Sequence, residues 1–272
     1  MKVIALYSIK GGVGKTAASV NLAYLAARDN AKTLLCDLDP QGSSSFYFRI
    51  KASKKFNSQK LLKGGKNIEK NIKGTDFENL DLLPSVMSLR NLDLHLDNTK
   101  NSKIHLKEII RPLKKEYDLI FIDCPPGINL VSENVFYAVD FILVPLIPTT
   151  LSILTYVKML KFFKKKGYDS SKIIPFFSMV EMRKKMHHDI MQKVNLKKSK
   201  ILKSYIPYAS DVEKMGIYRN PLSCFKPSSP AALSYESLWQ EIKLRKFSSK
   251  GETWFELVKY IAVFILFMSP WI

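Results

Sequence analysis

The sequence predicts an α/β fold: a doubly wound, mostly parallel sheet with helices on both faces. Short, continuous apolar runs bounded by glycine, proline or charged residues alternate with stretches whose apolar residues recur every three or four positions. Continuous apolar strands separated by helices are typical of a parallel sheet that is covered on both faces. The chain has 272 residues, of which 46% are hydrophobic, so it is long and apolar enough to bury a core.

The elements are expected in alternating order along the chain. Five apolar runs are predicted to be strands: residues 2–9, 32–39, 118–124, 141–148 and 173–180. Residues 16–30 and 152–167 have the apolar spacing of helices. Residues 51–75 are basic and interrupted by glycine, which favours short helices and loops over a core element.

A glycine-rich turn joins the first strand to the first helix. It reads Lys10-Gly11-Gly12-Val13-Gly14-Lys15-Thr16 and continues into Ala17. Glycines let successive amides point at one anion, the helix N-terminus adds its positive dipole, a lysine neutralises β and γ phosphates, and a hydroxyl can ligate Mg²⁺. A strand-to-helix turn without a ligand is the alternative, but the pattern and its context favour a phosphate-binding loop.

Two further strand ends carry carboxylates. Asp39 follows the second strand and Asp123 ends the third. Ligands of parallel sheets sit beyond the carboxyl ends of the strands, and an acid after four apolar residues is placed to hold the water shell of Mg²⁺. Such aspartates can also cap the next helix, and Pro40 after Asp39 also suits a turn.

Cys124 is interpreted as a small buried hydrophobe, because no second Cys or His lies at metal-ligand spacing.

These motifs carry a resemblance to a known family. KGGVGKT at 10–16, DLDPQGS at 37–43 and DLIFIDCPPG at 118–127 resemble the deviant Walker A family of P-loop ATPases, most closely the ParA branch of the ParA/MinD superfamily. The likeness covers residues 1–246 and includes LLPS at 82–85, VPLIPTT at 144–150 and the stretch that begins IPYASD at 206. It implies an ATPase domain over 1–246, followed by a linker and an apolar tail over 247–272.

The resemblance also implies residue roles and cofactors, ATP and Mg²⁺. The residues implied as catalytic are Lys10, which reaches the nucleotide of a partner subunit, Lys15, and Asp39, which positions the attacking water. Thr16, Asp39 and Asp123 are implied as metal residues. Nucleotide contacts are implied for the loop residues 10–17 and, around the adenine, for Met179 and Pro207.

The function that the resemblance implies is a timed switch. A lysine supplied by a partner subunit links ATP binding to dimerisation, so an ATP-bound homodimer is expected to bind DNA and to release it after slow, partner-stimulated hydrolysis. A ParB-like or cargo adaptor protein is the expected partner. The cargo would be a chromosome, a plasmid or a protein assembly.

The net charge of +19 favours a nucleic-acid partner. Residues 158–250 carry 21 basic and 7 acidic side chains, or +14 of the total. The candidate DNA contacts are Arg183, Lys184, Lys200, Lys203, Arg245 and Lys246. No helix-turn-helix or zinc-finger pattern precedes the ATPase motifs, so nonspecific, salt-sensitive binding is expected. Solvated helix faces are the alternative reading of this charge.

The cysteines and the tail bear on location. The sequence has three widely spaced cysteines, Cys36, Cys124 and Cys224, and this odd number favours a reducing compartment. No secretory signal is visible. A cytoplasmic, nucleoid-associated protein is therefore expected.

Residues 260–268 are apolar almost all round but short for a bilayer span. Membrane binding through this tail, as in a MinD-like spatial regulator, stays open beside packing on the body, a partner contact or no role.

Overall fold

A seven-stranded sheet organises the molecule. The computed structural model describes residues 1–99, 102–195 and 200–245. The strands are β1 (Lys2–Leu6), β2 (Thr33–Asp37), β3 (Lys73–Gly74), β4 (Leu80–Leu83), β5 (Leu119–Asp123), β6 (Phe141–Leu146) and β7 (Ile173–Phe177). Their order is β3-β4-β2-β5-β1-β6-β7, and every neighbouring pair is parallel except β3 and β4. The predicted fold class and all five predicted strands are confirmed, and the structure adds β3 and β4 at one edge.

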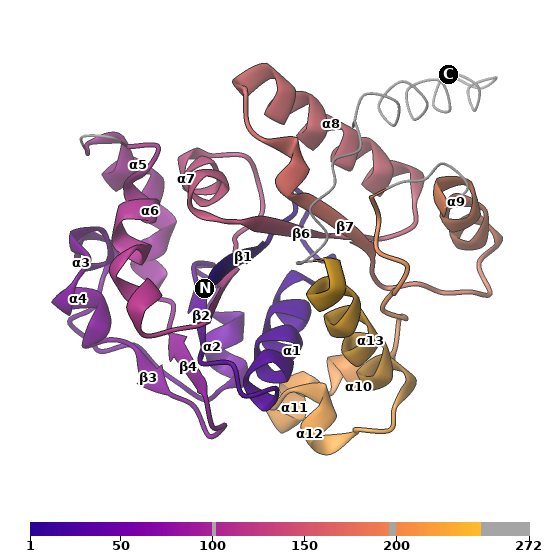
Figure 1. Ribbon diagram of the computed structural model, residues 1–272, viewed down its shortest axis with the longest axis horizontal. Helices are drawn as coiled ribbons and strands as arrows, with labels where there is room; N and C mark the ends of the chain where they lie inside the picture. Colours follow the sequence, from indigo (N-terminus) through magenta and orange to yellow (C-terminus); the bar gives the residue numbers. More distant parts are fainter. Residues whose placement is uncertain (100–101, 196–199, 246–272) are drawn as a thin grey trace.

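Helices connect the strands and cover the sheet (Figure 1). The α-helices are α1 (Lys15–Arg28), α2 (Ser43–Tyr47), α3 (Ser58–Lys63), α4 (Lys66–Glu69), α5 (Leu92–Asp97), α6 (His105–Ile110), α7 (Leu130–Ala138), α8 (Thr150–Lys166), α9 (Lys185–Asn195), α10 (Ser210–Glu213), α11 (Met215–Tyr218), α12 (Leu222–Phe225) and α13 (Pro230–Arg245). Short 3₁₀ turns span Met87–Asn91, Pro112–Lys115 and Ser170–Lys172. Both predicted long helices are confirmed as α1 and α8, and residues 51–75 hold the short helices α3 and α4.

Each face of the sheet has its own apolar core. In β1 and the residue that follows it, Val3, Ala5 and Tyr7 join the core on the side of α7 and α8. Ile4 and Leu6 join the core on the side of α1 and α13. This division follows from the two-residue repeat of a strand, which sends successive side chains to opposite faces. The continuous apolar runs in the sequence are therefore strands that are buried on both sides.

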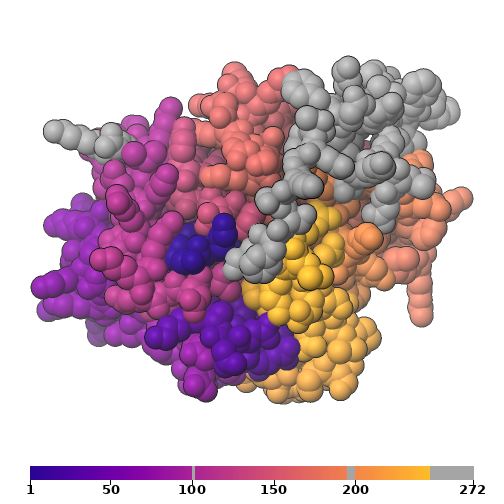
Figure 2. All heavy atoms as spheres, in the orientation of Figure 1, coloured from indigo at the N-terminus to yellow at the C-terminus, as the bar shows by residue number. Residues whose placement is uncertain are grey.

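The last helix covers the first one. The indole of Trp239 donates to Asp29 over 2.9 Å, Arg28 pairs with Glu236 at 2.8 Å, and the amide of Leu222 donates to Asn21 Oδ1 over 2.8 Å. Helices α1 and α13 are in contact, and their indigo and yellow surfaces meet in the lower half of Figure 2. The C-terminal third of the chain thus holds the helix that begins at the glycine-rich turn.

Two predictions fall outside the described residues. Lys246 and the apolar tail 247–272 belong to the part that the structure does not describe, so the boundary at 246 and the role of the tail stay predictions. Within the described ranges, no helix has both the length and the apolar character needed to cross a membrane.

Candidate nucleotide-binding site

The glycine-rich turn has the backbone of an anion-binding loop. Gly12 and Gly14 have φ of 68° and 86°, and Gly14 immediately precedes α1. Left-handed residues among right-handed ones gather successive amides into a concave nest, and the helix start adds its dipole. A Cβ at Gly14 would lie 2.9 Å from Ser178 Oγ, so close packing as well as φ requires glycine there.

The two lysines of the loop differ in their surroundings. Lys15 is only 7% exposed, and its ammonium donates to the carbonyl oxygen of Lys10 at 3.5 Å, so it lies beneath the loop. Lys10 is exposed, and its ammonium has no hydrogen bond or ion pair within the described ranges. The backbone amide of Lys10 donates to Ser8 Oγ, which fixes the head of the loop.

Two buried carboxylates lie side by side at the ends of β2 and β5. Asp37 and Asp123 are opposite each other in the parallel register of β2 and β5, and they are 1% and 0% exposed. Ser45 donates to Asp37 Oδ2 through its amide (2.8 Å) and its hydroxyl (2.7 Å), and Ser44 donates to Asp123 Oδ2 (2.8 Å). Among the residues that the structure describes, none donates a hydrogen bond to the Oδ1 atom of either carboxylate.

Burial sets the protonation behaviour of this pair. Loss of hydration raises the pKa of Asp37, and repulsion by Asp123 raises it further. Burial also raises the pKa of Asp123, while the hydroxyls of Ser44 and Thr16 and the ammonium of Lys15 lower it. A nearby cation would favour the ionised form of both carboxylates.

The residues present fit a magnesium ion. Mg²⁺ prefers oxygen ligands and usually combines one or two carboxylates with waters and substrate phosphates. The Oδ1 atoms of Asp37 and Asp123, which have no partner among the described residues, and the Thr16 hydroxyl near Asp123 supply that chemistry. No group of three or more His, Cys, Asp or Glu side chains in the described part of the chain forms a protein-only metal cage. Sequence reasoning did not assign Asp37, although the doubled acid of Asp37 and Asp39 was the signal.

Asp39 forms a turn beside this pair. Its Oδ1 accepts the amide of Gln41 at 3.0 Å, and its carbonyl oxygen accepts the amide of Gly42 and the hydroxyl of Ser85. The sequence left open that Asp39 belongs to a turn, and the structure shows such a turn, in which only Oδ1 of the carboxylate takes part. Oδ2 makes no hydrogen bond to the described residues, and Asp39 is close enough to Asp37 and Asp123 to raise the pKa of both.

The structure brings Met179 and Pro207 to the same corner. Val180 and Pro207 form a parallel bridge, with hydrogen bonds from Val180 to Ile206 (3.0 Å) and from Tyr208 to Val180 (2.9 Å). Met179 has a φ of 54°, a rare conformation for a large side chain. A Cβ at Gly14 would collide with the neighbouring Ser178, so this corner lies close against the glycine-rich loop.

The predicted DNA contacts have different environments. Arg183, Lys184 and Lys203 are exposed, and Lys184 pairs with Glu181 at 2.5 Å. The Arg245 guanidinium donates to the carbonyl oxygens of Lys200 (2.6 Å) and Ile201 (3.1 Å), so it holds the backbone of that segment. Lys200 is half-buried.

Helix α8 carries a basic stripe that was not singled out from the sequence. Lys158, Lys161 and Lys165 are exposed and have no hydrogen bond or ion pair to any described residue. Their spacing of three and four places them along one side of the helix, which was the available signal. Both α8 and α9 lie on the side where β6 and β7 end the sheet (Figure 1).

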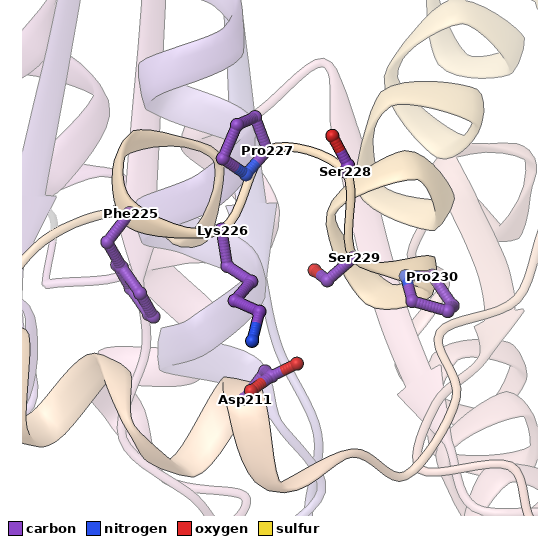
Figure 3. Close-up of a pocket in the computed structure, with 7 residues that line it drawn as sticks. All are labelled: Asp211, Phe225, Lys226, Pro227, Ser228, Ser229 and Pro230. Carbon is purple, nitrogen blue, oxygen red and sulfur yellow. The ribbon is translucent and has the colours of Figure 1, made fainter.

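A cavity of about 420 Å³ opens at the N-terminus of α13. It is lined by Asp211, Phe225, Lys226, Pro227, Ser228, Ser229 and Pro230. The side chains of Asp211 and Lys226 point toward one another across it (Figure 3). None of these residues was predicted as a site, and we assign no ligand to the cavity.

Comparison with known proteins agrees with this geometry. A family model described as an AAA domain matches residues 1–174. The virulence plasmid ParA family protein of Chlamydia psittaci is 30% identical over 255 residues, which cover 92% of this chain and 97% of that protein. The chain belongs to the ParA family of P-loop ATPases.

Other ParA-type proteins are similar over nearly the whole chain. The chromosome-partitioning ATPase Soj of Treponema pallidum is 28% identical over 249 residues, covering 90% of this chain and 98% of that protein. The crystal structure of a plasmid partition protein of Borrelia burgdorferi B31 bound to AMPPNP is 27% identical with a TM-score of 0.78, covering 90% of this chain and 99% of that one. The predicted family is therefore confirmed.

Proposed function

We propose that this ParA-family chain is a DNA-partitioning ATPase that acts as a nucleotide-gated dimer. The observation that carries the proposal is the contrast between Lys15, buried beneath the loop, and Lys10, exposed and without a partner among the described residues. Lys15 serves the nucleotide of its own subunit. Lys10 is free to reach a nucleotide held by a second copy, so ATP stabilises the dimer and the dimer retains ATP.

The chain's own residues would carry most of the phosphoryl-transfer site. The loop amides and Lys15 neutralise and orient the phosphates, and Asp39 Oδ2 orients the attacking water. Mg²⁺, when bound, would neutralise phosphate charge, held by the Thr16 hydroxyl and through water by Asp39 and Asp123. Asp37 would join this set because it lies opposite Asp123 and its Oδ1 has no partner among the described residues.

Hydrolysis would be slow until a partner accelerates it. Lys10 acts only from the second subunit, so the complete charge arrangement exists only in the dimer. Loss of the γ phosphate weakens the attraction of Lys10 for the opposite subunit, and the dimer separates. A ParB-like or cargo adaptor protein is the proposed stimulating partner; relatives named as chromosome and plasmid partition proteins support this.

Nonspecific DNA is the proposed binding partner of the ATP dimer. The contacts would come from Arg183, Lys184 and Lys203, extended by the exposed stripe Lys158, Lys161 and Lys165 of α8. Lys200 and Lys246 stay in the proposed face, whereas the guanidinium of Arg245 is engaged with main-chain carbonyls. Such a face binds phosphates without reading bases, and the protein would be cytoplasmic and associated with the nucleoid.

The experiment is retention of random duplex DNA over a salt series, with ATP, with ADP and with the Lys15→Ala variant. We expect the wild type to retain DNA with ATP but not with ADP, and we expect no retention by Lys15→Ala with either nucleotide. The triple variant K158Q/K161Q/K165Q should lower the slope of log K against log salt by about one for each phosphate that it no longer neutralises. The triple variant K51Q/K54Q/K55Q removes the same charge from an exposed stretch outside the proposed face and is the matched control.

Equal retention with ATP and ADP would contradict the gated dimer. Equal slopes for the two triple variants would contradict the proposed face, because the charge effect would then be general.

A further inference from the structure

The residues that follow β4 lie beside the turn that carries Asp39. Strands β2 and β4 are parallel neighbours, with Cys36 opposite Leu83 in the register, so the residues after the two strands leave the sheet together. Proline has no N–H for the ladder of hydrogen bonds, and β4 ends just before Pro84. The next residue is the half-buried Ser85, the last of the LLPS segment. This order places Ser85 within reach of the residues that follow β2.

The hydroxyl of Ser85 holds the backbone of this turn. It donates to the carbonyl oxygen of Asp39 over 2.5 Å, and the amide of Gly42 donates to the same oxygen over 2.9 Å. A carbonyl oxygen has two lone pairs, so both of its acceptor positions are used. Oδ1 of Asp39 accepts the amide of Gln41 over 3.0 Å, which fixes the carboxylate relative to the turn. Oδ2 accepts no hydrogen bond from any described residue.

The amide of Ser85 binds the same stretch a second time. It donates to Ser45 Oγ over 2.9 Å, and that hydroxyl donates in turn to Asp37 Oδ2 over 2.7 Å. Ser85 therefore bonds to both ends of the segment 39–45 through its two donors. A side chain at Gly42 would already touch Ser85, because its Cβ would lie 3.7 Å from Ser85 Cβ. The segment 39–45 is thus held by two bonds and packs closely between them.

We propose that Ser85 is a positioning residue for ATP hydrolysis: its hydroxyl and amide hold the segment 39–45 so that the carboxylate of Asp39 has a fixed place before the reaction begins. A group that orients the attacking water is most effective when it is already ordered, because ordering it during the reaction would add to the barrier. The inference rests on the proposed function in one point, the role of Asp39. Ser85 acts on the turn and not on the nucleotide, since both of its partners lie outside residues 10–16.

The test compares two hydroxyls on the same stretch of chain. Ser85→Ala removes the donor to Asp39, whereas Ser88→Ala removes the hydroxyl of another half-buried serine, whose oxygen accepts the amide of Ser58 over 3.0 Å. Each variant loses one oxygen that is bonded to a main-chain group. Hydrogen exchange of peptides over 39–45 is followed without nucleotide, and ATP hydrolysis with Mg²⁺ is measured as kcat and KM.

In Ser85→Ala, the segment 39–45 should exchange about fivefold faster than in the wild type, the average effect of one hydrogen bond on an equilibrium constant. The kcat should fall about tenfold, the lower end of what the hydrogen-bond partners of a metal-site carboxylate contribute. KM should stay within about twofold, because Ser85 does not bind the nucleotide. Ser88→Ala should match the wild type in all three measurements. Ser85→Thr keeps a hydroxyl and should recover most of both losses.

Three results would overturn the positioning role: equal exchange of the segment 39–45 in Ser85→Ala and the wild type, faster exchange with an unchanged kcat, or the same fall of kcat in Ser88→Ala. A Ser85→Thr protein with wild-type exchange but the low kcat of Ser85→Ala would also overturn it. The role of Asp39 is tested separately by Asp39→Ala, whose unchanged kcat would contradict the proposed function. In that case the exchange of Ser85→Ala still shows whether Ser85 holds the turn, and rates equal to those of the wild type would refute it.

Discussion

Replacing Gly14 with alanine should destabilise the nucleotide-free protein through two separable contributions. The first is conformational: at a φ of 86°, a Cβ costs about 1–2 kcal/mol. The second is steric: the Cβ would lie 2.9 Å from Ser178 Oγ. Turning or shifting this short, buried side chain costs about 1 kcal/mol. The expected loss is therefore about 2–3 kcal/mol, or roughly 5–10 °C in Tm.

A double-mutant cycle with Ser178→Ala separates the two contributions. Ser178→Ala removes the oxygen that the new Cβ would meet, so Gly14→Ala should cost about 1 kcal/mol less in that background. The assay is urea unfolding of the four proteins without nucleotide, with the slope m checked for equality. An equal cost of Gly14→Ala in both backgrounds would refute the contact, and no cost in either would refute the left-handed backbone.

Three other variants probe the site. Lys10→Ala should change the free energy of unfolding by no more than about 0.5 kcal/mol, because the side chain is exposed and has no partner among the described residues. In sedimentation, the same variant should form no ATP-dependent dimer. An unchanged dimer would contradict the proposed contact of Lys10 with the nucleotide of the second subunit. Burial and repulsion by Asp123 raise the pKa of Asp37, so the nucleotide-free protein should lose stability as pH rises from about 4 toward neutrality. Asp37→Asn should flatten this fall in thermal unfolding, and an unchanged profile would contradict the raised pKa of Asp37. Arg245→Ala should lower the free energy of unfolding, measured in urea, by about 1–2 kcal/mol. Arg245→Lys should recover little of this stability, because lysine lacks the planar guanidinium that reaches both carbonyl oxygens. Unchanged stability in Arg245→Ala would mean that Arg245 does not hold the backbone.

The strands that could be predicted from the sequence are those whose own residues form an apolar run. The five predicted runs are central or long enough to be recognised by composition, whereas β3 has two residues and β4 has four. Lys73–Gly74 is a strand only because it pairs with Leu82 and Asp81, and such pairing across the edge of a sheet leaves no periodicity in a basic, glycine-containing stretch.

The glycine-rich loop could be predicted because its chemistry is local, while two site features depend on tertiary contacts. Asp37 and Asp39 look equivalent in the sequence, but only the register of β2 against β5 puts Asp37 opposite Asp123 and leaves Asp39 in a turn. Arg245 looks like one more basic residue in a charged block. Its contact with two carbonyl oxygens some 45 positions away has no local pattern that could reveal it.

The packing of α13 on α1 has a consequence for synthesis of the chain. Helix α1 leaves the ribosome early, but its apolar side is covered by Leu238, Trp239 and Ile242, and its end is held by the bond from Trp239 to Asp29. The glycine-rich loop therefore exists in the nascent chain long before its supporting helix has a stable position. Closing a contact over about two hundred residues comes late in folding. A chain released before α13 would carry the complete loop motif but lack the packing that makes α1 a rigid base for it.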